Sequence, residues 1–360
     1  MRLCISADAH VGVNGKLKDI MWAMSKIRQY NHERDIDTWF MLGDLMHDRE
    51  SVGTSELYAL TQFFDDTDIK YGQQMHVLVG NHDMYLKNSW EINSLRPLSR
   101  HIKVYDSVQS VSIDGRRIWI LPFIYYENEY MARLAEIESN ISKDDILFTH
   151  IGVRGAKFNA CFLLQSWSTV DFAQSAFQRV LAGHFHCHQE VGRVTYPGSI
   201  IPYKFDEGDV DHGFLILDTD TLKCDFVSIW DGVKPGEYRP PQYLTFDSDD
   251  LSDLSLVNGN VIRILTSKEY ITQNKLMEIR QSVIDAGAVD VRWMHIATKD
   301  DVQSIEMAKM ATSKASELFE RYMNADKSAK ELNSSLLLKM NSEIVAEGDR
   351  LYEVQEDVSV

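Results

Sequence analysis

Acidic, amide and imidazole side chains gather in five short clusters within the first 186 residues. Carboxylate and amide oxygens, together with imidazole nitrogens, form a donor set that divalent transition metals accept. A single Asp-x-His pair is common by chance, and a lone histidine is more often structural than a ligand. Five such clusters in succession are very unlikely to occur by chance, and they predict metal-dependent chemistry. The clusters are Asp8-Ala9-His10, Gly43-Asp44, Gly80-Asn81-His82-Asp83, Thr149-His150 and Gly183-His184-Phe185-His186.

Each cluster follows a short apolar run that is typical of a buried strand. Open α/β sheets bind ligands beyond the carboxyl ends of their strands, so we expect the clusters to meet at such an edge. Helical spacing from Lys16 to Glu33 and from Ser55 to Phe64 then predicts a layered α/β fold. Asp114-Gly115 predicts a hairpin between Ser110–Ile113 and Arg117–Leu121, so we expect a mixed sheet. The five expected strands are Arg2–Ala7, Thr38–Leu42, Met75–Val79, Ile146–Phe148 and Arg179–Ala182.

The composition, 44% hydrophobic and 25% charged, is ordinary for a globular protein. No apolar run approaches the roughly 20 residues of a membrane span. The four cysteines have no paired spacing and the first residues show no signal-peptide pattern, so we expect a reducing, cytoplasmic location. A net charge of −17 argues against a protein that binds nucleic acid with its own basic surface. It leaves room for an acidic site that is neutralised by metal, or for a partner that supplies the positive surface.

With these motifs in their order, residues 8 to 186 resemble the calcineurin-like metallophosphoesterases. The resemblance implies an α/β fold, a four-layer sandwich with a two-metal site on one edge of its sheets. Two metals about 3.5–4 Å apart bind a phosphoryl oxygen, activate water and stabilise in-line displacement. We expect two Mn²⁺ ions, with Mg²⁺ as the alternative. The implied ligands are Asp8, His10 and His186 for one metal and Asn81, His150 and His184 for the other, with Asp44 bridging both.

Three further residues are candidates for catalysis within this resemblance. His82 directly follows a ligand, and we expect it to face the phosphate, where it would stabilise the transition state or protonate the leaving oxygen. The alternative is a histidine that only supports the ligands. Asp83 is the expected orienting partner of His82. His47, three residues past Asp44, either approaches the phosphate or packs beside the metals, and Asp48 is equally ambiguous.

The stretch after His186 points to a narrower group. Tyr196-Pro197-Gly198-Ser199, Phe205-Asp206-Glu207 and Gly213-Phe214 resemble the SbcD-type recombination exonuclease subunits, and the chain is most similar in its compactness to bacteriophage members. This resemblance implies a DNA substrate. Ala9 departs from the aromatic residue that often occupies the first motif, and that departure concerns the DNA-contacting loops rather than the chemistry.

Four parts are predicted along the chain. The region from 232 to 242 contains Pro235, Pro240 and Pro241 and has the character of a linker. In SbcD-type nucleases, the next unit caps the active site and a C-terminal helical pair grips the coiled coil of an SbcC-type ATPase; the resemblance implies the same here. The two apolar stripes of the tail also allow the helices to pack on each other. The parts are 1–231, a nuclease domain; 232–242, the linker; 243–297, a small α/β capping domain; and 298–360, the helical tail.

The leading hypothesis is a dimetal-dependent DNA exonuclease and endonuclease subunit of double-strand-break processing and recombination. It would be a homodimer, would work with an SMC-like ATPase and would have no membrane partner. One alternative is a general phosphatase or phosphodiesterase on a non-DNA substrate, which the negative charge favours. The other is a weakly catalytic architectural subunit at DNA ends, although a scaffold has no chemical need for Asn81, His82 and His186.

Overall fold

The computed structural model describes residues 1–13, 15–142, 144–157, 170–208, 210–234, 236–248, 251, 254–266 and 272–295. They divide into two compact units, one formed by Met1–Tyr243 and one that begins at Leu244. The predicted helical tail, 298–360, lies outside the described residues. Within the described ranges, no helix combines the length and apolar character that crossing a membrane requires.

The first sheet of the N-terminal unit has six strands in the order β14-β13-β1-β2-β3-β6. Four neighbours, β1, β2, β3 and β6, are parallel, as expected of buried apolar strands joined by helical crossovers. β13 pairs antiparallel with β1, and β14 pairs antiparallel with β13, so these two strands form one edge of the sheet. The strands are β1 (Arg2–Ser6), β2 (Thr38–Met41), β3 (Gln74–Leu78), β6 (Lys103–Tyr105), β13 (Gly213–Asp218) and β14 (Cys224–Ser228).

The second sheet also has six strands, in the order β11-β12-β10-β9-β8-β7. The predicted hairpin joins β7 to β8, and both turn residues, Asp114 and Gly115, have the positive φ of such a turn (51° and 75°). Both sheets are therefore mixed, as expected. The strands are β7 (Gln109–Ile113), β8 (Arg116–Leu121), β9 (Ile146–His150), β10 (Arg179–Gly183), β11 (Gln189–Val191) and β12 (Val194–Tyr196).

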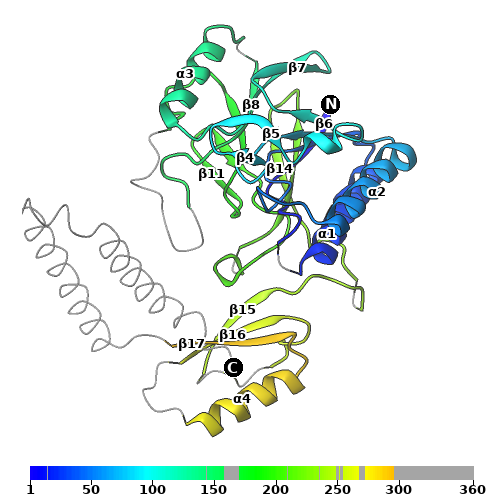
Figure 1. Cartoon of the computed structure of the whole chain (residues 1–360), viewed down its shortest axis with the longest axis vertical. Helices are drawn as coiled ribbons and strands as arrows, with labels where there is room; N and C mark the ends of the chain where they lie inside the picture. Colours follow the sequence, from blue (N-terminus) through cyan, green and yellow to red (C-terminus); the bar gives the residue numbers. More distant parts are fainter. Residues whose placement is uncertain are drawn as a thin grey trace, which may run out of the picture. The chain divides into compact units, whose positions relative to one another are not determined.

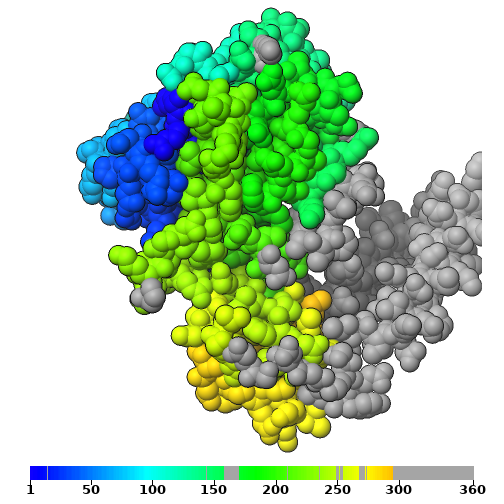
Figure 2. All heavy atoms as spheres, turned by 180° about the vertical axis from the view of Figure 1, so that it is seen from behind, coloured from blue at the N-terminus to red at the C-terminus, as the bar shows by residue number. Residues whose placement is uncertain are grey.

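Helices cover the outer faces of the two sheets. Figure 1 shows α1 (Leu17–Glu33) beside α2 (Thr54–Tyr71), with α3 (Glu127–Glu138) on the opposite side of the unit. One apolar cluster joins α1 and α2 to the first sheet, a second joins α3 to the other sheet, and a third fills the space between the sheets. The order helix, sheet, sheet, helix confirms the four-layer α/β sandwich. In Figure 2, the blue atoms of the N-terminal residues and the green atoms of the residues around 180–200 lie on opposite sides of this unit.

Short elements complete the N-terminal unit. A two-stranded hairpin, β4 (Met84–Leu86) and β5 (Ser89–Asn93), follows the third cluster directly, and a 3₁₀ turn, η1 (Arg96–Leu98), comes after it. A second 3₁₀ turn, η2 (Phe205–Glu207), lies between β12 and β13. These elements were not expected from the sequence, and η2 contributes Glu207 to the lining of the predicted site.

The described part of the second unit contains three strands and one helix. Its elements are β15 (Tyr243–Asp247), β16 (Val261–Thr266), α4 (Gln273–Asp285) and β17 (Asp290–His295), and β16 pairs parallel to β17. Thr272 caps α4, and Gly287 beyond its end has a φ of 97°. Val257, Ile262, Ile264, Val283 and Val291 form a separate small core. The role of this unit as a cap stays a prediction.

Candidate metal centre

All seven predicted metal ligands lie together, and they come from both sheets. Asp8, Asp44 and Asn81 follow β1, β2 and β3 of the first sheet, whereas His150 ends β9 and His184 follows β10 of the second. A cleft of about 380 Å³ is lined by five of the seven, His10, Asp44, Asn81, His184 and His186, and by His82. Asp8 and His150 are fully buried beneath it. The five strand ends therefore converge as expected, but across two sheets rather than along one.

The backbone at four of these residues is left-handed. Asp8, His10, Asp44 and His184 have φ values of 54°, 45°, 53° and 111°. Residues other than glycine seldom adopt this conformation, which costs about 1–3 kcal/mol at each position unless surrounding contacts enforce it. Backbone hydrogen bonds from Asp8 to Gly43 (3.1 Å) and from His10 to Asp44 (2.9 Å) hold the first two loops together. The conformation turns neighbouring side chains toward one point.

Glycines allow the two sheets to approach each other at the site. A Cβ atom on Gly183, at the end of β10, would overlap the carbonyl oxygen of Leu42 beyond β2 and come within 2.8 Å of His150 Nδ1. A Cβ atom on Gly80 would overlap the Asp44 carboxylate. The glycine that precedes each of these clusters is thus required by the close packing of the strand ends.

The first expected ligand group consists of Asp8, His10 and His186. The Nε2 atoms of His10 and His186 face each other at 3.0 Å. His186 Nδ1 lies 2.7 Å from the Glu207 carboxylate, so this nitrogen donates its proton there and Nε2 carries the lone pair. The Asp8 carboxylate accepts the His184 backbone N–H at 3.1 Å, which links this group to the next cluster.

The second expected group consists of Asn81, His150 and His184. Asn81 Oδ1 lies 3.0 Å from His150 Nε2 and 2.9 Å from His184 Nδ1. The other nitrogen of His150, Nδ1, donates to the carbonyl oxygen of Leu42 at 2.7 Å, which leaves Nε2 to face the cleft. Asp44 Oδ2 lies between the two groups, 3.4 Å from His150 Nε2 and 3.8 Å from His10 Nε2. This is the place that a bridging ligand would occupy.

Burial and neighbouring charges shift the pKa values of these groups strongly. Burial raises the pKa of Asp8 to about 7. Burial also lowers the pKa of His184 to about 3 and that of His10 well below its usual value, so both rings are neutral at neutral pH. Burial opposes the charged form of His150, but Asp44 outweighs it and raises the pKa of His150 to about 9. His10 and His184 thus already have the neutral form that a metal ligand needs, whereas His150 would release a proton when a cation binds.

The donor set fits a pair of divalent cations. Three compact groups among the described residues each offer ligand atoms within 4.8 Å of one another: Asp8–His10–His186, Asp8–Asp44–His150 and His10–His47–His82. The first two contain predicted ligands only, and they share Asp8. Mixed carboxylate and imidazole donors suit divalent transition metals. The third group consists of imidazoles alone and includes both histidines that were expected to act on the substrate.

His82 and His47 form a stacked pair beside the cleft. Their ring centroids are 5.4 Å apart with an angle of 11° between the planes. His82 Nδ1 donates to the backbone carbonyl of His47 at 2.7 Å, which leaves Nε2 for a substrate. The His82 backbone N–H donates to Asp44 Oδ1 at 2.7 Å. Both histidines line the cleft, and burial lowers the pKa of His47.

Asp83 has a different partner from the one expected. It is fully buried, and its carboxylate accepts backbone N–H groups from Asp44, Met46 and Gly80, all at 2.9 Å. The carbonyl of His47, rather than this carboxylate, holds the ring of His82. Asp83 therefore joins the loops after β2 and β3. The expectation from adjacency was incorrect because consecutive side chains in this turn point in different directions.

Two residues at the site carried no assigned role in the sequence. Glu207 orients His186, as described above, and its other oxygen accepts the Tyr203 N–H at 2.8 Å. The Tyr203 hydroxyl donates to the backbone oxygens of Asp8 and Ala9, and the side chain lines the cleft. The Phe205-Asp206-Glu207 motif was the sequence signal that could have identified Glu207. It does not name the partner, because His186 lies 21 residues earlier in the chain.

Comparisons with known proteins agree with this arrangement. A family model described as calcineurin-like phosphoesterase matches residues 1–188. Exonuclease subunit 1 of Enterobacteria phage T4 is 25% identical over 346 residues, which cover 90% of this chain and 93% of the relative. A subunit of the nuclease SbcCD of Staphylococcus epidermidis is 22% identical over 249 residues, covering 61% and 66%. The solved structure of Yfce, a phosphoesterase from E. coli, is 14% identical with a TM-score of 0.32 and covers 64% of this chain and 100% of its own.

These matches confirm the resemblance to SbcD-type subunits and to their compact phage members. The family match spans all five strand ends that carry the proposed ligands. Its members use divalent metals, for which the donor set of the cleft is suited. On the match to the family model, this chain belongs to the calcineurin-like phosphoesterases.

Proposed function

We propose that this protein is a dimetal-dependent nuclease that hydrolyses phosphodiester bonds of DNA. The observation that carries the proposal is the group of seven oxygen and nitrogen donors, five of which line one cleft together with His82. DNA as the substrate is supported by the similarity to a phage exonuclease subunit over 90% of the chain. Asp8, His10, Asp44, Asn81, His150, His184 and His186 are the proposed ligands.

Each group of the cleft has a defined part in this reaction. Two bound divalent ions, Mn²⁺ in this proposal, would supply Lewis-acid stabilisation of the phosphoryl group and an activated water. In its protonated form, His82 contacts the substrate and donates the Nε2 proton to the leaving oxygen, which leaves a neutral ring whose Nδ1–H stays bound to the His47 carbonyl. His47 stacks on His82 and keeps its ring in place. Asp83 and Glu207 position the loops and the ligands.

The assembly belongs to the same proposal. The names of both nuclease relatives describe subunits, which supports a partner. A chain with a net charge of −17 gains most from a partner that brings positive surface to DNA. We place an SMC-like ATPase of the SbcC type in that role, bound by residues 298–360, on a homodimer acting in double-strand-break processing and recombination in the cytoplasm.

The test is hydrolysis by the full chain with Mn²⁺ on linear duplex DNA, single-stranded DNA and bis-p-nitrophenyl phosphate. Asp8→Asn should abolish all three activities. His82→Gln should keep its bound metal and lower DNA cleavage by roughly 10²- to 10⁴-fold. DNA cleavage at the wild-type rate in both variants would contradict the assignment of the site.

A general phosphoesterase is the second candidate, and the net charge of −17 favours it. It predicts that the wild type turns over small phosphate esters while all DNA substrates remain intact. The same three substrates therefore separate the two functions. Metal content after purification does not, because several divalent ions compete for mixed oxygen and nitrogen sites.

A further inference from the structure

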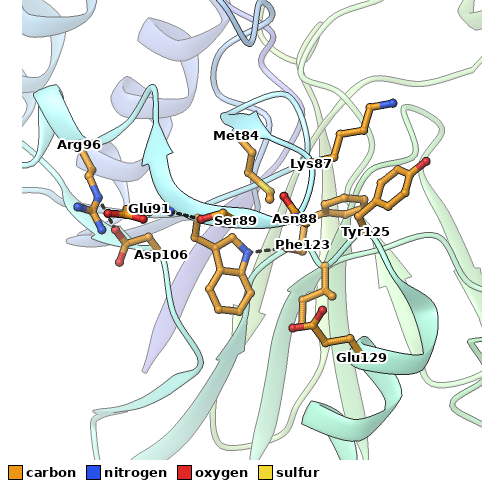
Figure 3. A pocket seen from close by; sticks show the side chains of 12 residues that line it. Met84, Lys87, Asn88, Ser89, Glu91, Arg96, Asp106, Phe123, Tyr125 and Glu129 are labelled. Atoms are coloured by element: carbon orange, nitrogen blue, oxygen red, sulfur yellow. Dashed lines mark hydrogen bonds and ion pairs between the residues drawn. The ribbon is translucent and has the colours of Figure 1, made fainter.

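A second cavity, of about 260 Å³, lies between the β4–β5 hairpin and the segment that leads from β8 to α3 (Figure 3). Met84, Trp90, Phe123 and Tyr125 give it apolar and aromatic walls. Polar side chains, among them Lys87 and Glu129, complete the lining. None of these residues is a proposed metal ligand or belongs to the sequence motifs, so the proposed hydrolysis assigns no role to this cavity.

Backbone hydrogen bonds fix this cavity to the metal-site loop. The Phe123 N–H donates to the carbonyl of Val79, two residues before Asn81, at 3.0 Å. At the other end, the Ser94 N–H donates to the carbonyl of Asp83 at 2.8 Å, so the hairpin leaves from and returns to this loop. Trp90 Nε1 then donates to the carbonyl of Phe123 at 2.6 Å and joins the two walls. The cavity is therefore held at a set position beside Asn81 and His82.

One side chain is shared by the cavity and the metal centre. Phe123 stacks on the ring of His184, with centroids 6.0 Å apart and an angle of 23° between the planes. It also meets the ring of His150 edge-on at 6.0 Å. Because Phe123 lines the cavity as well, a group bound there lies one aromatic ring away from two proposed metal ligands.

The lining selects a flat, uncharged group. Tyr125 is 48% exposed and lies beside Phe123 in Figure 3, so an aromatic ring can stack on its face. Glu129, below these rings in that view, also lines the cavity; its carboxylate repels a phosphate but accepts hydrogen bonds from an amino group. The Lys87 ammonium lies 5.4 Å from the centre of the Tyr125 ring, at the rim, where it can pair with a phosphate. Aromatic walls, a carboxylate acceptor and a cation at the rim match a nucleotide bound through its base.

We propose that this cavity binds one nucleobase of the strand that is cut, adenine, cytosine or guanine, through Tyr125 and Glu129. The inference rests on the proposed nuclease function and deepens it. A base can reach the cavity only when it is unstacked and unpaired, which costs a few kcal/mol in a duplex and least in single strands and at frayed ends. The cavity therefore makes the metal centre selective for unpaired nucleotides next to the scissile phosphate.

The test combines a change in the DNA, an abasic site, with a change in the protein, Tyr125→Ala. The kinetics of Mn²⁺-dependent cleavage are measured for each change alone and for both together. Single-stranded oligonucleotides carry one abasic site at successive positions around the cut. One position should raise KM about tenfold, the effect expected for loss of one base–aromatic stack. Tyr125→Ala should raise KM by the same factor on the intact strand and have no further effect on that abasic strand.

Mn²⁺ binding supplies the first control, because Tyr125 is not a proposed ligand. The Kd of Tyr125→Ala for Mn²⁺ should stay within twofold of the wild type, which also shows that the variant is folded. Tyr85→Ala is the matched control, since Tyr85 is a tyrosine of similar exposure (50%) on the β4–β5 hairpin, the other wall, but does not line the cavity.

Three outcomes would overturn the inference. Independent, additive effects of the abasic site and Tyr125→Ala would mean that the base binds elsewhere. An equal loss in Tyr85→Ala would indicate a general hairpin surface instead of the cavity. Unchanged cleavage by Tyr125→Ala would remove the base site while leaving the nuclease function in place, whereas ester hydrolysis without cleavage of any oligonucleotide would overturn the nuclease function itself.

Discussion

At the scale of single residues, the site depends on how each histidine uses its two nitrogens. His150 donates Nδ1–H to Leu42, His186 to Glu207 and His82 to His47. In each case the hydrogen bond sets which nitrogen keeps its lone pair, and therefore which one faces the cleft. Partners outside the ligand set thus decide whether the seven donors can bind cations.

Glu207 is the partner whose removal tests this argument most directly. Glu207→Gln keeps the length of the side chain and removes the charge that raises the pKa of His186 and makes the ring a better donor. We expect the Kd for Mn²⁺ to rise about 10- to 100-fold, measured by isothermal titration calorimetry. Asp206→Asn, a change at the exposed neighbour, is the control. Equal affinities in all three proteins would show that Glu207 has no part in metal binding.

His76 on β3 predicts a specific sensitivity to acid. Burial lowers the pKa of His76 to about 4, against an ordinary value of 6.5. Below pH 6.5 the unfolded chain therefore takes up a proton that the folded chain does not, so stability falls as the pH falls from about 6.5 to about 4. A shift of this size corresponds to about 3 kcal/mol.

The measurement for His76 is urea unfolding at pH 7 and pH 4.5. His76→Gln should lose less unfolding free energy between these two pH values than the wild type, whereas His32→Gln, at an exposed histidine, should lose as much as the wild type. An identical acid loss in His76→Gln and the wild type would show that other groups account for the effect.

The proposed ligands could be named from the sequence because each one lies within a few residues of the end of a predicted strand. A cluster such as Gly183-His184 is recognisable within a few residues, and the strand before it sets its position. Glu207 and Tyr203 could not be assigned in this way, since their contacts to His186 and Asp8 depend on how distant segments pack. The contacts of Asp83 could not be predicted for the same reason, because its carboxylate accepts backbone N–H groups from the loop after β2.

At the scale of elements, the two sheets meet where glycine permits it. Gly183→Ala places a Cβ atom against the carbonyl of Leu42, a backbone atom that cannot rotate away. We expect a loss of about 2–3 kcal/mol in unfolding free energy, typical of overpacking, together with weaker Mn²⁺ binding because His184 follows directly. Denaturant unfolding and calorimetry measure the two effects.

The control for this steric argument is Gly192→Ala. Gly192 has a φ of 60° and no atom within 4 Å of an added Cβ, so the change tests backbone strain without a clash. It should cost about 1 kcal/mol and leave Mn²⁺ affinity unchanged. A smaller loss in Gly183→Ala than in Gly192→Ala would contradict the close packing of the strand ends.

Helices and strands could be predicted from the sequence where their apolar residues recur with a regular period. The expected helix from Ser55 to Phe64 extends in the structure to Tyr71, because Asp65, Asp66 and Asp68 continue it on its polar face and only Thr67 is buried there. The β4–β5 hairpin was not predicted, since Tyr85 and Leu86 are both exposed and break the alternation that marks a strand. This hairpin forms one wall of the proposed base site.

At the scale of the whole molecule, the metal centre joins two sheets that otherwise meet through apolar packing. The first sheet contributes Asp8, Asp44 and Asn81, and the second contributes His150 and His184. Cations that bind all of them favour the folded state, because the unfolded chain brings no such set together. The second unit has its own core and contains none of these ligands.

Metal binding should therefore stabilise the first unit selectively. With free Mn²⁺ at 100 times its Kd, each ion adds about 2.7 kcal/mol to the unfolding free energy, which raises the Tm of a unit of this size by about 5–10 °C. Differential scanning calorimetry of the full chain, with Mn²⁺ and with EDTA, measures this shift. Asp44→Asn should lose most of it, because the bridging position serves both ions, whereas Asp48→Asn, four residues further along the chain, should retain it. A Tm shift in Asp44→Asn as large as in the wild type would mean that Mn²⁺ binds outside the cleft. A Tm shift confined to the transition of the second unit would mean that Mn²⁺ binds to that unit and not to the proposed site.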